Sequence, residues 1–108
     1  MSTFDEREKG FENKYKRDQE FDFKVTARRN RLLGEWAAGE MGITGDAVAD
    51  YAKEVVASDF EESGDDDVVR KVLGDLEAKG VSIDEHGLRR QMDKLMSTAR
   101  DQLQAETD

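Results

Sequence analysis

The sequence predicts an all-α protein, a small four-helix bundle with a flexible N-terminal arm. The 108 residues include no proline and no cysteine, which favours uninterrupted helices and excludes disulfides and thiolate metal sites. Apolar residues recur at helical spacing in four stretches, whereas no stretch alternates for long enough to be a strand. The first 20 residues contain too few apolar side chains to form a core of their own.

The first helix is expected over about residues 21–38. Its apolar stripe consists of Phe21, Val25, Leu32 and Trp36, which fall on one face of a helix. A tryptophan in such a stripe is most simply a core residue. The helix is expected to end near Gly39 or Gly42, because glycine readily adopts the left-handed conformation of a C-terminal cap.

Three further helices are expected at about residues 44–60, 65–79 and 83–104. Their apolar residues recur at steps of three and four: Val48, Tyr51, Ala52, Val55 and Val56; Val69, Val72, Leu73 and Leu76; Leu88, Met92, Leu95, Ala99 and Leu103. Short connections favour antiparallel neighbours and therefore a bundle.

Polar residues predict where these helices start. Thr44 is expected as the N-cap of the second helix. Ser63 with Asp66, and Ser82 with Glu85, have the spacing of a capping box, in which each end residue bonds the other's backbone. Gly80 is expected just after the third helix.

The N-terminal arm differs from the rest in charge and in apolar content. Residues 1–31 have a net charge of +2 and residues 32–108 a net charge of −11, within a total of −9. On a helical wheel Phe4, Phe11 and Tyr15 lie within about 40° of one another, but Gly10 costs the helix about 1 kcal/mol against Ala. We therefore expect residues 1–20 to form a mobile arm that becomes fully helical against a partner, and residues 21–108 to form the bundle.

Composition and isolated motifs exclude several classes of function. The net negative charge argues against nucleic-acid binding, and the longest apolar runs, of three residues, cannot span a membrane. The N-terminus lacks the pattern of a secretory signal. His86 has no histidine or cysteine partner, and the triplet Asp65–Asp67 is better explained by a helix N-terminus than by calcium. We expect no cofactor, no metal and no enzymatic activity.

Two groups of residues are candidates for binding another protein. Phe4, Phe11 and Tyr15 could enter a partner's groove or dock loosely on their own bundle, and both alternatives stay open on physical grounds. The basic cluster of Arg28, Arg29 and Arg31 could form a secondary contact with an acidic partner or a phosphate. A solvated or intramolecularly paired face is the other interpretation of these arginines. An acidic adaptor that uses its bundle surface is the main alternative function.

Several segments together resemble the zeta subunit, the ATPase inhibitor of certain bacterial ATP synthases. They are residues Phe4–Tyr15, Ala27–Gly34, Trp36–Ala38, Tyr51–Val56, Asp59–Glu62 and Arg89–Asp93. The likeness extends over nearly the whole chain in matching order.

The resemblance implies a four-helix bundle whose arm enters the catalytic head of the F-type ATP synthase. There the arm would lie between the catalytic subunits and the rotor and block rotation in the direction of ATP hydrolysis. The residues that match the inhibitory motif are Phe4, Arg7, Glu8, Phe11, Lys14 and Tyr15. The resemblance also implies a cytoplasmic protein that is peripheral at the inner membrane through the synthase.

Overall fold

Four α-helices form the secondary structure of this protein in a computed structural model, which describes residues 2–59 and 64–107, with side chains for residues 19–59 and 64–106. The helices are α1 (Ser2–Glu40), α2 (Asp46–Ser58), α3 (Asp66–Ala78) and α4 (Glu85–Thr107). Within the described residues there is no strand. The all-α prediction and the four predicted helices are therefore confirmed.

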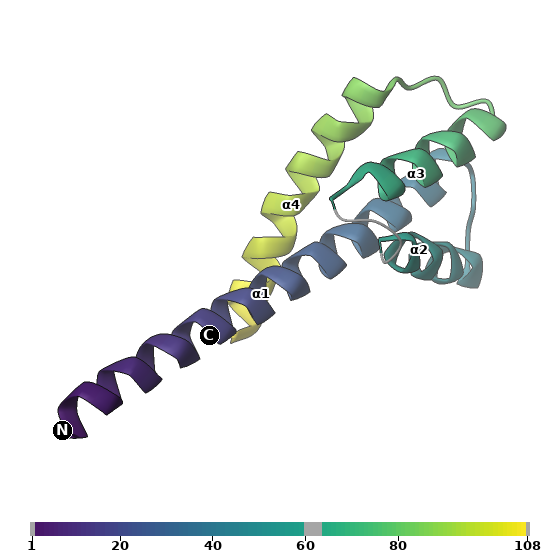
Figure 1. The fold of residues 1–108 in the computed structure, drawn as a ribbon. Helices are drawn as coiled ribbons and strands as arrows, with labels where there is room; N and C mark the ends of the chain where they lie inside the picture. Colours follow the sequence, from purple (N-terminus) through teal and green to yellow (C-terminus); the bar gives the residue numbers. More distant parts are fainter. Residues whose placement is uncertain (1, 60–63, 108) are drawn as a thin grey trace.

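Helix α1 is much longer than the helix expected at residues 21–38, because it also includes the arm. Its N-terminal part extends as a single rod beyond the other three helices (Figure 1) and gives the molecule a length of 65 Å against 27 and 21 Å across. Acid-first pairs at i,i+4, such as Glu12 with Lys16, favour this helix. That the arm needs a partner to become fully helical, and that the chain divides near residue 20, stay predictions.

Helices α1 and α3 end in the same way, with a glycine whose positive φ reverses the chain. After α1, Gly42 has φ 78°, and the backbone N–H of Ile43 donates to the carbonyl of Ala38 at 2.8 Å. After α3, Gly80 has φ 78°, and Val81 donates to Leu76 at 2.9 Å. This hydrogen bond back to the helix is that of a Schellman motif. The predicted C-terminal glycines are confirmed, with Gly42 rather than Gly39 after α1.

The predicted N-caps are less accurate. Helix α2 follows Gly45, not Thr44, and Gly45 adopts φ 68°, which favours glycine. In α4 the cap is Asp84 rather than Ser82, because a carboxylate oxygen of Asp84 accepts a hydrogen bond from the Gly87 N–H at 2.7 Å. The predicted cap Ser63 lies outside the described residues.

Two apolar clusters hold the helices together. The larger contains buried residues of all four helices, including Leu33, Val55, Val72 and Met92, with Trp36 packed against it. The smaller joins α1 to α4 through Val25, Ala99 and Leu103, with Phe21, Leu32 and Met96 packed against it. Trp36, Met92 and Met96 are thus core residues, as predicted. The smaller cluster lies next to the arm and fixes the part of α1 from which the arm extends.

Candidate functional site

The six predicted inhibitory residues all belong to the part of α1 that extends beyond the bundle (Figure 1). They are Phe4, Arg7, Glu8, Phe11, Lys14 and Tyr15, and their side chains lie outside those that the structure describes. The described side chains begin at residue 19, in the segment of α1 that joins the arm to the bundle, here called the root of the arm (residues 19–28).

Arg28 ties the root of the arm to the C-terminal end of α4. Its Nη1 donates to Gln102 at 2.8 Å and its Nη2 donates to the carboxylate of Glu106 at 2.9 Å. The guanidinium is mostly buried, whereas Glu106 is more than half exposed. The two hydrogen bonds lie beside the smaller apolar cluster and reinforce the same contact between α1 and α4.

Arg29 holds the connection between α2 and α3 against α1. Its side chain is 2% exposed, its Nη2 donates to Asp65 at 2.8 Å and its Nε donates to Asn30 at 2.7 Å. The Asn30 amide in turn donates to Asp59 at 3.0 Å. Asp59 and Asp65 stand on either side of the connection, so this buried pair of α1 residues fixes both of its ends.

The predicted cluster of arginines is therefore split by the fold. Arg28 and Arg29 pair within the molecule, which was the alternative interpretation, and Arg29 has almost no surface left for a direct partner contact. Arg31 is 52% exposed and makes a longer contact of 3.7 Å with Glu35, one turn along α1. A secondary contact with a partner stays a prediction for Arg28 and Arg31, but for Arg29 it would require the buried ion pair to break.

An exposed aromatic residue, which the sequence did not lead us to expect as a binding residue, lies at the root of the arm. Phe23 is 65% exposed and is the one large apolar side chain so exposed among the described residues. It borders a groove of about 420 Å³, here called the root groove, whose lining includes Phe23, Lys24, Ala27, Arg31, Val56 and Leu103. The sequence pattern could have indicated this exposure. Residues two apart on a helix point to nearly opposite sides, so if Phe21 faces the core then Phe23 faces away from it.

A second groove continues from the first along α1 and α2. This α1–α2 groove has a volume of about 320 Å³ and shares Arg31 and Val56 with the root groove. The small side chains of Ala49 and Ala57 make it mostly apolar, and Lys53 stands at its edge. Together the two adjoining grooves form a mostly apolar surface, along which lie, among the residues described, four basic residues and one acidic residue, Glu35.

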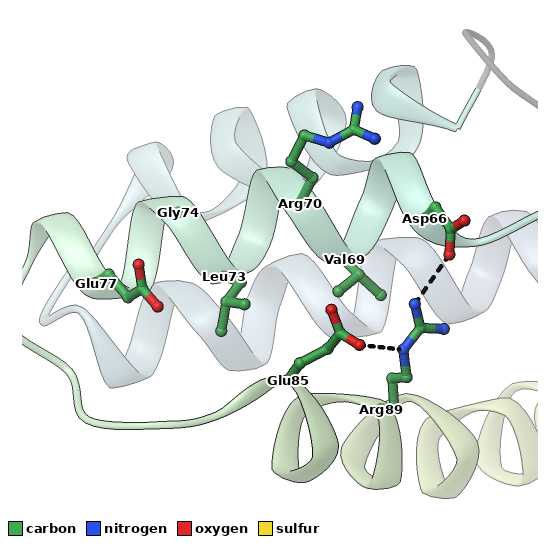
Figure 2. A pocket seen from close by; sticks show the side chains of 8 residues that line it. All are labelled: Asp66, Val69, Arg70, Leu73, Gly74, Glu77, Glu85 and Arg89. Carbon is green, nitrogen blue, oxygen red and sulfur yellow. Dashed lines mark hydrogen bonds and ion pairs between the residues drawn. The ribbon is translucent and has the colours of Figure 1, made fainter.

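A larger groove, of about 610 Å³, lies between α3 and α4 (Figure 2). Val69 and Leu73 form an apolar floor, and Arg89 of α4 bridges Asp66 at 2.9 Å and Glu85 at 3.4 Å. The hydrogen bond with Asp66, followed by that with Glu85, raises the pKa of the Arg89 guanidinium. The charged groups at this end of the groove thus satisfy one another.

Each acidic residue of the triplet at the start of α3 pairs with a different arginine. Asp65 accepts from Arg29, Asp66 from Arg89 at 2.9 Å, and Asp67 from Arg70 at 3.3 Å. Because the three carboxylates diverge to separate partners, they do not converge on one cation. Within the residues searched, no group of three acidic or histidine side chains could hold a metal ion.

Among the described residues, none of the helices is both long enough and apolar enough to cross a membrane. His86 is exposed in the first turn of α4.

A family model described as ATPase inhibitor subunit zeta matches residues 1–102, nearly the entire chain. The chain belongs to the zeta-subunit family of ATPase inhibitors. The resemblance found in the sequence is therefore confirmed. The family is described as an inhibitor subunit rather than as an enzyme, and its name implies an ATP synthase as the partner.

A solved structure shares the fold of this zeta-family chain. It was determined by solution NMR, is 49% identical, and has a TM-score of 0.70, with 78% of this chain and 95% of that chain covered. A comparison with curated proteins finds no match. The arm residues predicted from the resemblance lie within the range that the zeta family model matches.

Proposed function

We propose that this zeta-family protein inhibits ATP hydrolysis by the catalytic head of an F-type ATP synthase. In this proposal the arm enters as a helix between the catalytic subunits and the rotor and blocks rotation. The observation that supports it most directly is the course of α1, whose N-terminal part extends as a single rod beyond the other three helices (Figure 1). Residues 2–19 of this helix span about 27 Å. A helix that extends in this way is available for insertion into a partner.

The arm has the composition of a helix that binds in a groove. Phe4, Phe11 and Tyr15 recur on one face by helical spacing, and an aromatic side chain removes about 150–250 Å² from water when it is fully buried. We propose that these three residues occupy apolar parts of the cleft. Arg7, Glu8 and Lys14 would pair with charged groups at its sides.

Inhibition by this route needs no chemistry from the inhibitor. The cleft of a rotary motor changes shape during the cycle, and a helix that fits one shape stabilises that state over the others. Rotation then stalls because leaving the stabilised state requires the helix to be expelled. The bundle would remain outside as an anchor, which would make the protein a cytoplasmic one held at the inner membrane through the synthase.

The experiment is ATP hydrolysis by a matching synthase head, measured with the full chain and with a variant that lacks residues 1–19. Because the N-terminal part of α1 extends beyond the other three helices (Figure 1), the deleted protein should keep the helical circular dichroism and melting temperature of the bundle. We expect the full chain to inhibit and the deleted chain to have no effect. Full inhibition by the deleted chain would refute the proposal.

The isolated arm peptide separates this function from the alternative adaptor. The adaptor interpretation rests on the net charge of −11 over residues 32–108 and treats the arm as a passive tail. If the arm acts as proposed, a peptide of residues 1–20 binds the synthase head on its own. A bundle that binds equally well without its arm, together with a peptide that does not bind, would favour the adaptor.

A further inference from the structure

The surface around Phe23 combines exposure, an apolar groove and positive charge. Phe23 is 65% exposed, and the root groove beside it continues past Val56 into the α1–α2 groove. Val56, which lines both grooves, belongs to neither of the two apolar clusters that hold the bundle together. A single exposed apolar residue is ordinary, but Phe23 adjoins the apolar lining of the root groove, and contiguous exposed apolar surface is a feature of protein–protein contacts.

The charge of this surface is opposite to that of the whole molecule. The chain has a net charge of −9, yet four basic residues line the two grooves, Lys24, Arg28, Arg31 and Lys53. The one described acidic residue in the two linings is Glu35, which pairs with Arg31. Lys24 and Lys53 are exposed, and among the described residues neither has a carboxylate within ion-pairing distance. Cations beside an apolar groove, with no ion-pair partner among the described carboxylates, complement an acidic segment that has an apolar side chain.

The position of the surface along α1 determines what it would face. One continuous helix runs from Ser2 through the arm and on past Phe23. A protein that encloses the arm up to residue 19 must therefore end within about one turn of Phe23, since each residue adds about 1.5 Å. The rim of the enclosing cleft would therefore lie next to the root groove.

We propose that the root groove and the α1–α2 groove dock an acidic segment at the rim of the cleft that takes the arm. The inference rests on the proposed function, because the cleft is defined by the arm. An apolar side chain of that segment contacts Phe23 and Val56, and its carboxylates pair with Lys24 and Lys53. The arm blocks rotation, whereas this second contact increases the affinity of the inhibitor without taking part in the block.

The test compares inhibition curves of full-length variants on the same synthase head. Phe23→Ala should raise the half-inhibitory concentration about tenfold, as the loss of a central apolar contact does, and leave inhibition at saturation complete. Phe23→Leu, which keeps an apolar side chain, should restore most of the affinity. Because Phe23 is largely exposed, both variants should have the same melting temperature as the wild type.

Charge reversal tests the acidic nature of the partner. Lys24→Glu combined with Lys53→Glu should raise the half-inhibitory concentration and reduce its dependence on salt. The matched control is Lys79→Glu combined with Lys94→Glu, which changes the net charge by the same amount at two exposed lysines outside both grooves and should behave as wild type. If Phe23→Ala and the Lys24/Lys53 variant give the same curves as this control, the docking proposal is wrong.

Three other outcomes can be told apart. Loss of inhibition at saturation by Phe23→Ala, with unchanged affinity, would make Phe23 part of the block and would overturn the docking role. A wild-type dimer that Phe23→Ala converts to a monomer in sedimentation analysis would mean that a second copy occupies the grooves, which also overturns it. If the wild type neither binds nor inhibits the head, the proposed function fails first, and the docking proposal fails with it.

Discussion

At the scale of single residues, the angular position of each arginine around α1 determines whether it is buried or exposed. Arg29 and Arg31 are two residues apart, which separates them by about 200° around α1. Arg29 is therefore buried against Asp65, and Arg31 is half exposed beside Glu35. The same side-chain chemistry thus stabilises the fold at one position and remains on the surface at the other.

Replacing Arg29 by Ala should destabilise the bundle by roughly 2–4 kcal/mol. The change removes the buried partner of the Asp65 carboxylate and leaves the side-chain amide oxygen of Asn30 (Oδ1) without its donor. Arg31→Ala is the control and should change the free energy of unfolding by less than about 0.5 kcal/mol. Urea denaturation followed by circular dichroism measures both. Equal small changes in the two variants would show that the buried pair contributes nothing.

Tyr51 is a second residue whose role depends on burial. Its hydroxyl donates to Asp75 at 2.8 Å and so links α2 to α3, while the Lys71 ammonium lies 5.3 Å from the centre of its ring. Burial of the side chain raises the pKa of the Tyr51 hydroxyl far above its ordinary value, and the hydrogen bond to Asp75 raises it further. The folded protein therefore favours the neutral, protonated form of the Tyr51 hydroxyl.

This shift predicts how stability depends on pH. A group with a raised pKa stabilises the fold fully below its unfolded value, near 10 for tyrosine, and loses that contribution as the pH rises above it. Tyr51→Phe should cost about 1 kcal/mol at pH 7, from the lost hydrogen bond. The difference between wild type and variant should shrink above pH 10. Urea denaturation at pH 7 and at pH 10.5 checks this, and a constant difference would contradict it.

At the scale of elements, the helix ends show what local sequence can and cannot predict. Gly42 and Gly80 were identified because a C-terminal cap needs a positive φ that glycine adopts without strain. The predictions of Thr44 and Ser82 as N-caps were wrong, because the position of an N-cap depends on where the incoming connection meets the helix. The residue that precedes α2 is Gly45, one position after Thr44, and the residue that caps α4 is Asp84, two positions after Ser82.

The contact between α1 and α2 depends on Gly34, a detail that no pattern in the sequence indicated. A Cβ atom on Gly34 would lie 2.6 Å from the Cα atom of Ala52, so the two helices must separate to accommodate it. Gly34→Ala should therefore destabilise the protein by about 1–3 kcal/mol despite a better helix propensity. The measurement is the free energy of unfolding in urea.

Gly74 provides the matched control for this substitution. It lies inside α3, and a Cβ atom added there would have no neighbour within 4 Å, so Gly74→Ala should stabilise the protein by about 0.5–1 kcal/mol. A stabilising Gly34→Ala would show that the helices can move apart at little cost.

At the scale of the whole molecule, the fold class and the arm were predictable and the root groove was not. The apolar stripes and the missing prolines indicate four helices, and the shortage of apolar side chains in residues 1–20 indicates the arm. The exposure of Phe23, by contrast, depends on where α2 and α4 end beside α1, which is a matter of tertiary packing. The buried ion pair of Arg29 depends in the same way on tertiary packing, because its partner Asp65 lies 36 residues further along the chain.

The arm's proposed role predicts a separation of inhibition from stability. Phe11→Ala and Tyr15→Ala should each weaken inhibition by about tenfold or more, as the loss of an aromatic anchor at an interface does. Neither should change the melting temperature, because the part of α1 that contains them extends beyond the other three helices (Figure 1). Parallel inhibition and melting curves check both. A matching fall in melting temperature would assign the two rings to the bundle's own core.

The unbroken course of α1 also makes the spacing between arm and bundle part of the inhibitor's design. One added residue near position 20 would turn the arm by about 100° about the helix axis and lengthen it by about 1.5 Å. Seven added residues would nearly restore the angle but shift the arm by about 10 Å. Orientation and reach are thus coupled in one rod, so a change in length alone would misalign two surfaces whose amino acids are all intact.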